Sequence, residues 1–275
     1  MAASEPSSGE GYDRLYAAFD APLIRQLRRE AHGEDIGQHS WVTAAELRSD
    51  LGRLSLTAAS RLLDVGCGPC GPLVFAVQST GCTGTGVDVS APAIEAGRAR
   101  AAAAGVQDRV ALLLADLNRP IPLAGPSFDA VICLDAVLHL RDRKAFFDEM
   151  ARLLEPGGRL VLTDAAVVTG PVSNGEIERR SANGYTQFVP AGVNEGLLEA
   201  AGFRLIGRED RTDSVVLNAS GRLKAINAHR SEIEAADGID AFARQQRYIE
   251  TVVALSQRRA LSRFMYIAEL ERPAM

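Results

Sequence analysis

The stretch that most constrains the fold is residues 61–71, where a short apolar run breaks into a loop containing Gly66, Gly68 and Gly71. This GxGxxG spacing lets a backbone turn tightly after a strand and come close to a nucleotide-like ligand. The spacing alone is a weak signal. Asp64 sharpens it, because an ionised carboxylate beside the loop would repel a bound phosphate. We therefore predict a ligand that is cationic, or at least not phosphorylated.

Strands and helices are predicted to alternate on both sides of this loop. The predicted strands cover residues 62–65, 84–89, 110–115, 128–134 and 159–163, and the predicted helices between them cover residues 72–80, 91–104 and 143–154. Such alternation is typical of an open parallel sheet with helices on both faces. The predicted fold class is therefore α/β.

Four acids, Asp64, Asp88, Asp116 and Asp135, stand at or near the ends of these strands, the edge where open α/β sheets bind ligands. Asp88 ends the second strand, 22 residues after Gly66. That is about the distance at which an acidic side chain accepts hydrogen bonds from ribose hydroxyls. Asp116 and Leu117 follow the third strand, where they are placed to meet an adenine ring. An exposed strand-end aspartate is the simpler alternative for each acid.

The glycine loop also contains Cys67-Gly-Pro-Cys70, the four residues of the thioredoxin redox motif. A redox pair stands at a helix start with one exposed thiolate, whereas these cysteines interleave with the glycines of a ligand loop. We predict packing roles and leave the redox alternative open. Neither Cys82 nor Cys133 has a neighbouring histidine or cysteine at metal-ligand spacing, so no metal site is predicted.

The net charge limits which classes of binding partner can be predicted. A net charge of -5 and a pI near 5.5 give little attraction to a phosphate backbone, so nucleic acid is not a predicted partner. The first 11 residues are small and polar and are predicted to be disordered. No apolar stretch is long enough to span a bilayer, and we expect a cytoplasmic protein without membrane contact.

Residues 12–58 are predicted to form a helical N-terminal segment, in which Pro22 splits the first helix. A polar loop follows, with Gln38 and the only tryptophan, Trp41. Thr43 then starts another helix with a capping-box pattern. This loop is either a surface connection or a lid that reaches over the ligand.

The C-terminal half is less regular. Residues 169–190 show no periodicity and are predicted to be a long loop. The predicted elements after it are helix 195–201, strand 203–208, helices 214–236 and 239–259, and strand 264–270. Two helices between the last two strands would cap the ligand edge. The predicted organisation is a core of residues 59–212 and 260–275 with a cap of residues 213–259.

Five motifs appear in order over about residues 60–165. They are Leu62-Leu63-Asp64-Val65-Gly66-Cys67-Gly68, Gly86-Val87-Asp88-Val89-Ser90, Ala115-Asp116-Leu117, Phe128-Asp129-Ala130-Val131-Ile132-Cys133 and Leu154-Glu155-Pro156-Gly157-Gly158-Arg159-Leu160. Together they resemble the motifs of class I S-adenosylmethionine-dependent methyltransferases. The resemblance implies a Rossmann-like, seven-stranded sheet whose last strand is antiparallel, with S-adenosylmethionine as the cofactor.

The resemblance also implies roles for individual residues. Asp64 would orient the methionine end of the cofactor, Asp88 would hold the ribose, and Asp116 with Leu117 would meet the adenine. The predicted cofactor contacts are Gln38, Trp41, Asp64, Gly66, Cys67, Gly68, Gly71, Asp88, Val89, Asp116, Leu117 and Leu134.

The flanks more loosely resemble small-molecule methyltransferases, such as those acting on sarcosine and dimethylglycine, phosphoethanolamine or tocopherol. No Asn-Pro-Pro-Tyr-type stretch follows the fourth strand, where Cys133-Leu134-Asp135-Ala136 stands instead. Methylation of base amino groups or glutamine is therefore disfavoured. The expected acceptor is a small molecule attacking through nitrogen, oxygen or carbon. The oligomeric state stays open, a homodimer included.

Methyl transfer is an in-line displacement, so orientation and exclusion of water supply most of the acceleration. A base is needed only for a protonated acceptor. His139, four residues after Asp135, is the candidate base, with a structural histidine as the alternative. Tyr185, His229 and Tyr248 are weaker candidates for substrate contact.

Two other functions compete with this interpretation. An NAD(P)-dependent oxidoreductase shares the glycine spacing and the ribose-binding acid, and a non-catalytic cofactor-binding protein could share the fold. Asp64 and the Pro156-Gly157-Gly158 turn favour the methyltransferase.

Overall fold

The computed structural model describes residues 10–182 and 184–271. Most of the segment predicted to be disordered, residues 1–11, lies outside this range. Among the described residues, no helix combines the length and apolar character required to cross a membrane.

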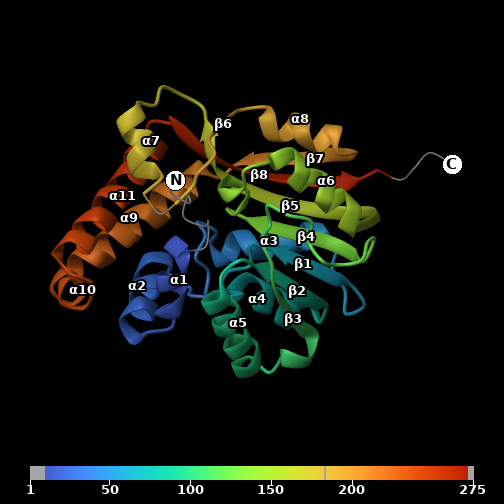
Figure 1. Ribbon diagram of the computed structural model, residues 1–275, viewed down its shortest axis with the longest axis horizontal. Helices are drawn as coiled ribbons and strands as arrows, with labels where there is room; N and C mark the ends of the chain where they lie inside the picture. The colour runs from blue at the N-terminus through green and yellow to red at the C-terminus, as the bar shows by residue number, and fades with distance from the viewer. Residues whose placement is uncertain (1–9, 183, 272–275) are drawn as a thin grey trace, which may run out of the picture.

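One sheet organises the molecule, with the strand order β3-β2-β1-β4-β5-β8-β7 (Figure 1). The strands are β1 (Arg61–Val65), β2 (Thr83–Asp88), β3 (Val110–Leu114), β4 (Phe128–Leu134), β5 (Leu154–Val168), β6 (Val189–Pro190), β7 (Phe203–Asp210) and β8 (Leu261–Leu270). Neighbours from β3 to β5 are parallel, and β8 is antiparallel to both β5 and β7. The predicted seven-stranded sheet with an antiparallel last strand is confirmed, and the two-residue β6 adds to it by pairing with β5.

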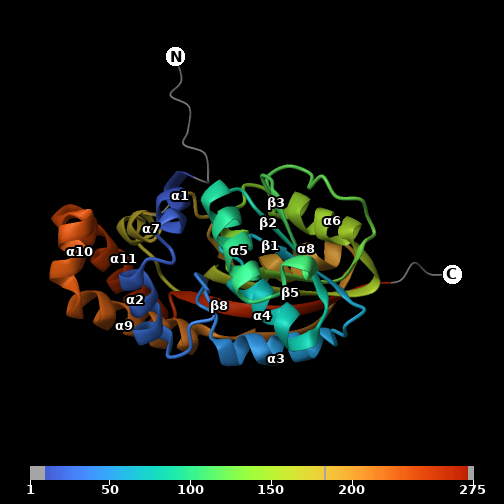
Figure 2. The same ribbon diagram turned by 90° about the horizontal axis from the view of Figure 1, so that it is seen from below.

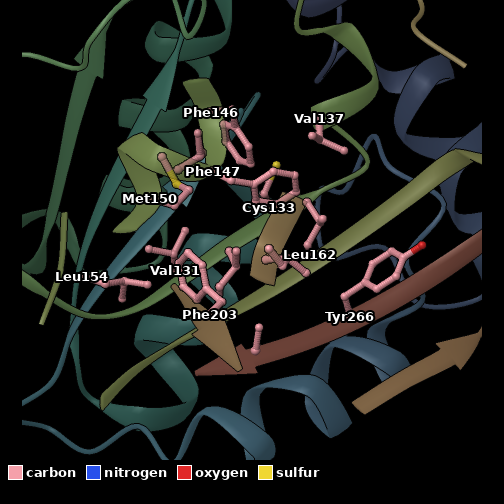
Figure 3. Packing of buried hydrophobic residues seen from close by; sticks show 14 of the residues in the cluster. Val131, Cys133, Val137, Phe146, Phe147, Met150, Leu154, Leu162, Phe203 and Tyr266 are labelled. Atoms are coloured by element: carbon pink, nitrogen blue, oxygen red, sulfur yellow. The ribbon is translucent and has the colours of Figure 1, made fainter. Parts of the chain in front are cut away.

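Helices cover both faces of the sheet, so its central strands are apolar on both sides. One face carries α3 (Ala44–Leu54), α4 (Gly71–Thr80) and α5 (Ala91–Ala103), and the other carries α6 (Arg143–Leu153) and α8 (Val193–Ala200). Side chains alternate between the two, so Leu62 packs toward α3–α5 while Leu63 packs toward α6. Figure 3 shows Phe147 and Met150 of α6 over Val131 of β4.

The remaining helices gather beyond one end of the sheet, as Figures 1 and 2 both show. They are α1 (Glu10–Ala17), α2 (Pro22–His32), α7 (Asn174–Arg180), α9 (Thr212–Ala228), α10 (Arg230–Asp237) and α11 (Ile239–Gln257). The last three form the cap predicted between the final two strands. Phe242 and Ile249 of α11 share a buried cluster with Leu27 of α2, which ties the cap to the N-terminal helices.

Two predicted elements were wrong. Residues 169–190 are not a plain loop, because α7 forms within them. Its capping box, in which Ser173 and Glu176 bond each other's backbone, was a readable signal. The predicted helix 214–236 is broken at His229 into α9 and α10, although neither glycine nor proline stands at the break. The first helix does divide at Pro22, as predicted. Short 3₁₀ turns occupy Gln107–Arg109 and Val137–His139.

Candidate functional site

A cavity of about 770 Å³ opens at the carboxyl ends of β1 to β4, between the sheet and the helices beyond it. This volume falls in the range of small-molecule sites. The predicted site residues that line it are Gln38, Trp41, Asp64, Gly66, Cys67, Gly68, Asp88, Val89, Asp116, Leu117, Leu134, His139 and Tyr248. Gly71, Tyr185 and His229 are not among the lining residues.

The glycine loop has a backbone that side chains would disturb. Gly66 and Gly68 both have positive φ, 73° and 52°. A Cβ on Gly66 would lie 2.4 Å from the Cβ of Ala136. Cys70 also adopts a left-handed conformation, with φ of 60°, where it precedes α4. The loop therefore keeps its backbone accessible at the cavity wall.

Asp88 fixes this loop from the end of β2. Its carboxylate accepts hydrogen bonds from the backbone N–H of Gly68 at 2.8 Å and of Ser90 at 2.9 Å. Burial raises the pKa of Asp88, and these two bonds oppose the rise. The side chain thus holds the loop and presents an acidic group to the cavity.

Asp64 is more deeply buried than Asp88, and it has fewer hydrogen-bond partners. It is 2% exposed, and its Oδ2 is buried without a hydrogen-bond partner among the described residues. Burial, with a smaller contribution from Asp88, raises the pKa of Asp64 to about 8. A buried carboxylate without a partner is costly to ionise, so a cationic ligand at this end of the cavity would be strongly favoured.

Helix α1 covers the glycine loop. The Ser90 hydroxyl and the Asp13 carboxylate lie 2.6 Å apart, which joins α1 to the start of α5. A Cβ on Gly68 would lie 3.2 Å from the hydroxyl oxygen of Tyr16, so this ring rests on the loop. Arg100 of α5 also binds Asp20 at 2.9 Å. The N-terminal segment is thus held over the loop, the position that a lid would occupy.

Gly71 allows the N-terminal segment to pack closely against the glycine loop. A Cβ there would lie 2.3 Å from the carbonyl oxygens of Ile36 and Gly37. Gly71 therefore allows two backbone segments to approach each other, and it is not a wall of the cavity. Gln38 is similarly engaged within its own loop, since its side-chain oxygen accepts from the N–H of Ile36 at 2.9 Å.

Replacing Gly71 with alanine is expected to destabilise the protein by about 1–3 kcal/mol, because the backbone of Ile36 and Gly37 must move to make room. Gly52 in α3 is the matched control, with no atom within 4 Å of a Cβ built there. Gly52→Ala should stabilise by about 0.5–1 kcal/mol, since alanine is the better helix former. Denaturant unfolding of both variants measures the difference, and equal effects would contradict this role for Gly71.

His139 does not stand alone in the cavity. Its Nδ1 lies 2.8 Å from the carbonyl oxygen of Tyr185, and its Nε2 lies 2.8 Å from the hydroxyl of Tyr12. Because a carbonyl only accepts, Nδ1 carries the proton and Nε2 accepts from Tyr12. Burial lowers the pKa of His139, which favours the neutral imidazole. Tyr12 was not predicted as a site residue, because nothing in the sequence of α1 indicates that this side chain reaches His139.

Asp135, which follows β4, connects separate elements of the fold. Its carboxylate accepts from the backbone N–H of Trp41 at 2.9 Å and binds Arg263 of β8 at 2.9 Å. Arg263, only 1% exposed, also pairs with Glu46 of α3 at 3.2 Å. This network joins the loop of Trp41, the sheet and the α3 capping box, in which Glu46 also bonds Thr43.

The two cysteines of the loop are buried and form no disulfide, and the Cys70 thiol donates to the Cys67 sulfur at 3.3 Å. The neighbouring Cys70 thiol and burial raise the pKa of Cys67. A Cβ on Gly97 would lie 2.7 Å from the Cys70 sulfur, so the side chain fills the space beside α5. These contacts fit the predicted packing roles.

Two predicted substrate contacts point elsewhere. The Tyr185 side chain is 39% exposed and stacks with Arg141, and only its backbone carbonyl reaches His139. His229 binds Glu30 at 3.1 Å and Glu232 at 3.0 Å, away from the cavity wall. Tyr248 does line the cavity, and its hydroxyl accepts from Arg180 at 3.0 Å. Arg180 lies on the helix that the sequence analysis missed.

Comparisons with known proteins agree with this geometry. The family model described as a methyltransferase domain matches residues 63–162. The chain is 33% identical to 27-O-demethylrifamycin SV methyltransferase of Amycolatopsis mediterranei over 214 residues, 74% of this chain and 75% of that protein. It is 40% identical to methyltransferase GfsG of Streptomyces halstedii over 115 residues, 42% of this chain and less than half (41%) of that protein.

A solved structure with the same fold is phosphoethanolamine N-methyltransferase 2 of Haemonchus contortus, in complex with phosphomonomethylethanolamine and S-adenosylhomocysteine. The TM-score is 0.78 at 20% identity, covering 98% of this chain and 61% of that one. The predicted resemblance to small-molecule methyltransferases is confirmed. The chain belongs to the methyltransferase domain family.

Proposed function

We propose that this protein transfers a methyl group from S-adenosylmethionine to a hydroxyl oxygen of a small-molecule acceptor. The observation that carries the cofactor assignment is the buried carboxylate oxygen of Asp64, Oδ2, which has no hydrogen-bond partner among the described residues and lies beside the glycine loop. S-Adenosylmethionine would bring positive charge to that position, whereas NAD would bring a pyrophosphate.

The residues at this end of the cavity fit the cofactor. Asp64 would face the cationic methionine end, and Asp88 would accept from the ribose hydroxyls. Asp116 and Leu117 line the wall beyond Asp88, where the adenine would lie. The H. contortus relative of the same fold, solved with S-adenosylhomocysteine, supports this assignment.

When bound, S-adenosylmethionine supplies an electrophilic methyl group on a positively charged sulfur. The chain supplies orientation and exclusion of water, which together are worth up to about 7–11 kcal/mol in favourable cases. The cap and the N-terminal helices close the cavity around the reacting groups. Trp41, Leu138 and Ile249 contribute apolar wall on the acceptor side.

The pair of His139 and Tyr12 favours a hydroxyl acceptor. A hydroxyl must lose its proton as it attacks, and the pair provides a proton acceptor inside the cavity. His139 Nε2 would take the proton, either directly or through the Tyr12 hydroxyl that it already binds at 2.8 Å. The carbonyl of Tyr185 holds the imidazole in the tautomer that can accept.

The test of this function is methyl transfer from isotopically labelled S-adenosylmethionine to a panel of hydroxylated aromatic and macrocyclic compounds and their amine counterparts. We expect label to appear on oxygen, with equimolar S-adenosylhomocysteine. Transfer to amines alone would contradict the hydroxyl assignment. Absence of both transfer and cofactor binding would contradict the proposed function.

His139→Ala is expected to lower turnover of such a hydroxyl acceptor by about 10²–10⁴-fold, the usual contribution of a general base. Because burial holds the pKa of His139 below its ordinary value of 6.5, wild-type kcat/KM for the acceptor, measured at saturating S-adenosylmethionine, should stay level as the pH falls from 8 to 6.5. It should decline only at lower pH, where the imidazole becomes protonated. A pH–rate profile measures this.

His229→Ala is the matched control, because His229 lies outside the cavity wall and binds two glutamates. We expect its turnover to equal that of wild type. Tyr12→Phe shows whether the hydroxyl relays the proton, since the ring is retained. Unchanged turnover in His139→Ala across the pH range would remove this residue from the mechanism.

A further inference from the structure

The charged groups of the cavity wall are separated by sign. Asp64 and Asp88 lie at the glycine loop, where no ion pair to either is formed among the described residues. The wall built by α7 and the cap carries two arginines, Arg180 and Arg222. The cofactor of the proposed function matches the acidic end, which leaves the basic end to the acceptor.

Arg180, the last residue of α7, is 5% exposed and lines the cavity. Within the described part of the chain its hydrogen-bond partner is the Tyr248 hydroxyl, a neutral group at 3.0 Å, and its guanidinium lies 5.5 Å from the centre of the same ring. No carboxylate of the described residues forms an ion pair with it. Burial lowers the pKa of His139 and raises the pKa of Tyr12; the charge of Arg180 adds to the first effect and opposes the second, so Arg180 stands near the proposed base.

Arg222 of α9 is likewise a cavity-lining arginine whose hydrogen-bond partners are neutral. It donates to the carbonyls of His39 and Ser40 at 2.9 Å and lies 4.4 Å over the Trp41 ring, all of them neutral partners. Burial lowers the pKa of Arg222 to about 10. Asp135 acts on it electrostatically but is already bound to Arg263.

Other charges on this wall are either paired or exposed. Arg28 binds Asp35 at 3.0 Å. Asp237 and Arg244 line the cavity from the cap, and both are exposed to solvent. The uncompensated buried charge on this wall is therefore positive. Arg222 already donates to two backbone carbonyls, whereas Arg180 donates to the Tyr248 hydroxyl, so Arg180 is the group better placed to bind a ligand.

Removing a guanidinium from water without an anionic partner is costly, so an anionic ligand group beside it would be favoured. Guanidinium also bonds carboxylate and phosphate oxygens through a planar set of donors. Resting on the proposed function, we propose that Arg180 binds an anionic oxygen group of the acceptor, so that the substrate is an apolar molecule carrying a carboxylate or phosphate near the hydroxyl that is methylated.

The test uses 1-naphthoate and 1-naphthyl phosphate as anionic probes and 1-naphthamide as their neutral counterpart. Binding to the S-adenosylhomocysteine-loaded protein is followed by the fluorescence of Trp41, the only tryptophan of the chain and a lining residue. We expect at least one anionic probe to bind about tenfold more tightly than the amide. The probe that does so distinguishes carboxylate from phosphate recognition.

Arg180→Gln should abolish this preference, and Arg180→Lys should restore part of it, since lysine keeps the charge without the planar donors. Arg179→Gln is the matched control, because Arg179 precedes it on α7, is exposed and does not line the cavity. Its preference should equal that of wild type. Retained S-adenosylhomocysteine binding shows that each variant is folded.

Equal binding of anionic and neutral probes to wild type, or an anion preference that survives in Arg180→Gln, would overturn the proposal. Failure of the wild-type protein to bind S-adenosylhomocysteine would instead contradict the proposed function. The probe titration therefore tests the role of Arg180, and the S-adenosylhomocysteine titration separately tests the proposed function.

Discussion

Asp64→Asn is expected to make the ligand-free protein more stable while weakening its binding of S-adenosylhomocysteine. The carboxylate is 2% exposed with an unpartnered oxygen, so a neutral amide costs less to bury. We expect a gain of at least about 1 kcal/mol, or about 2–4 °C in melting temperature. Loss of the charged partner should weaken binding about 10- to 100-fold.

The pH dependence of the wild-type protein follows from the same group. The folded pKa is about 8 and the ordinary value is 3.8, so the unfolded chain loses this proton first. The contribution of Asp64 to stability is therefore fully present below about pH 4 and is lost as the pH rises toward 8. Binding of the cationic ligand should strengthen over the upper part of this range, as the carboxyl ionises.

Asp88→Asn provides the contrast, since Asp88 already accepts two backbone hydrogen bonds. It should weaken binding without stabilising the protein. Thermal unfolding and calorimetric titration between pH 6 and 9 measure both quantities. Loss of stability in ligand-free Asp64→Asn would show that the carboxylate has a structural partner.

Arg263→Met is expected to lower the free energy of unfolding by about 3–5 kcal/mol, the usual cost of removing one member of a buried ion pair. Arg263 is 1% exposed, and its loss leaves Asp135 and Glu46 without their shared cation. The loop of Trp41 should loosen as well, because Asp135 holds its backbone N–H.

Arg61→Met is the control for this variant. Arg61 binds Asp129 at 3.0 Å, but both side chains are about 40% exposed. Exposed pairs contribute about 0–1 kcal/mol, so this substitution should change stability little. Denaturant unfolding of both variants gives the comparison. Equal losses would mean that the Arg263 network is no stronger than a surface pair.

The core could be predicted because its signals are local. The strand that ends at Asp64, the glycine loop and the acid 22 residues after Gly66 each follow from short-range spacing. The alternation of strands and helices then gives the parallel sheet, and the capping box at Thr43 gives the start of α3. These features lie within a few residues of the elements they specify.

The acceptor side could not be predicted in the same way, because its contacts join distant segments. Tyr12 and His139 are 127 residues apart, and the pairing of Arg180 with Tyr248 spans 68. Asp135 was expected among the ligand-edge acids and does line the cavity, but its carboxylate is bound to Arg263 and to the backbone N–H of Trp41. Tyr185 and His229 were predicted from their positions in the long loop and on the cap helices, but their side chains contact Arg141 and two glutamates instead.

The cavity's preference for a cationic ligand is tested most directly by calorimetric titration of the full chain with S-adenosylhomocysteine and, separately, with NAD. S-Adenosylhomocysteine keeps the ammonium group and lacks a pyrophosphate, so Asp64 and Asp88 should admit it and repel NAD. We predict saturable binding of one S-adenosylhomocysteine per chain and no binding of NAD. Tight binding of NAD without binding of S-adenosylhomocysteine would contradict the account.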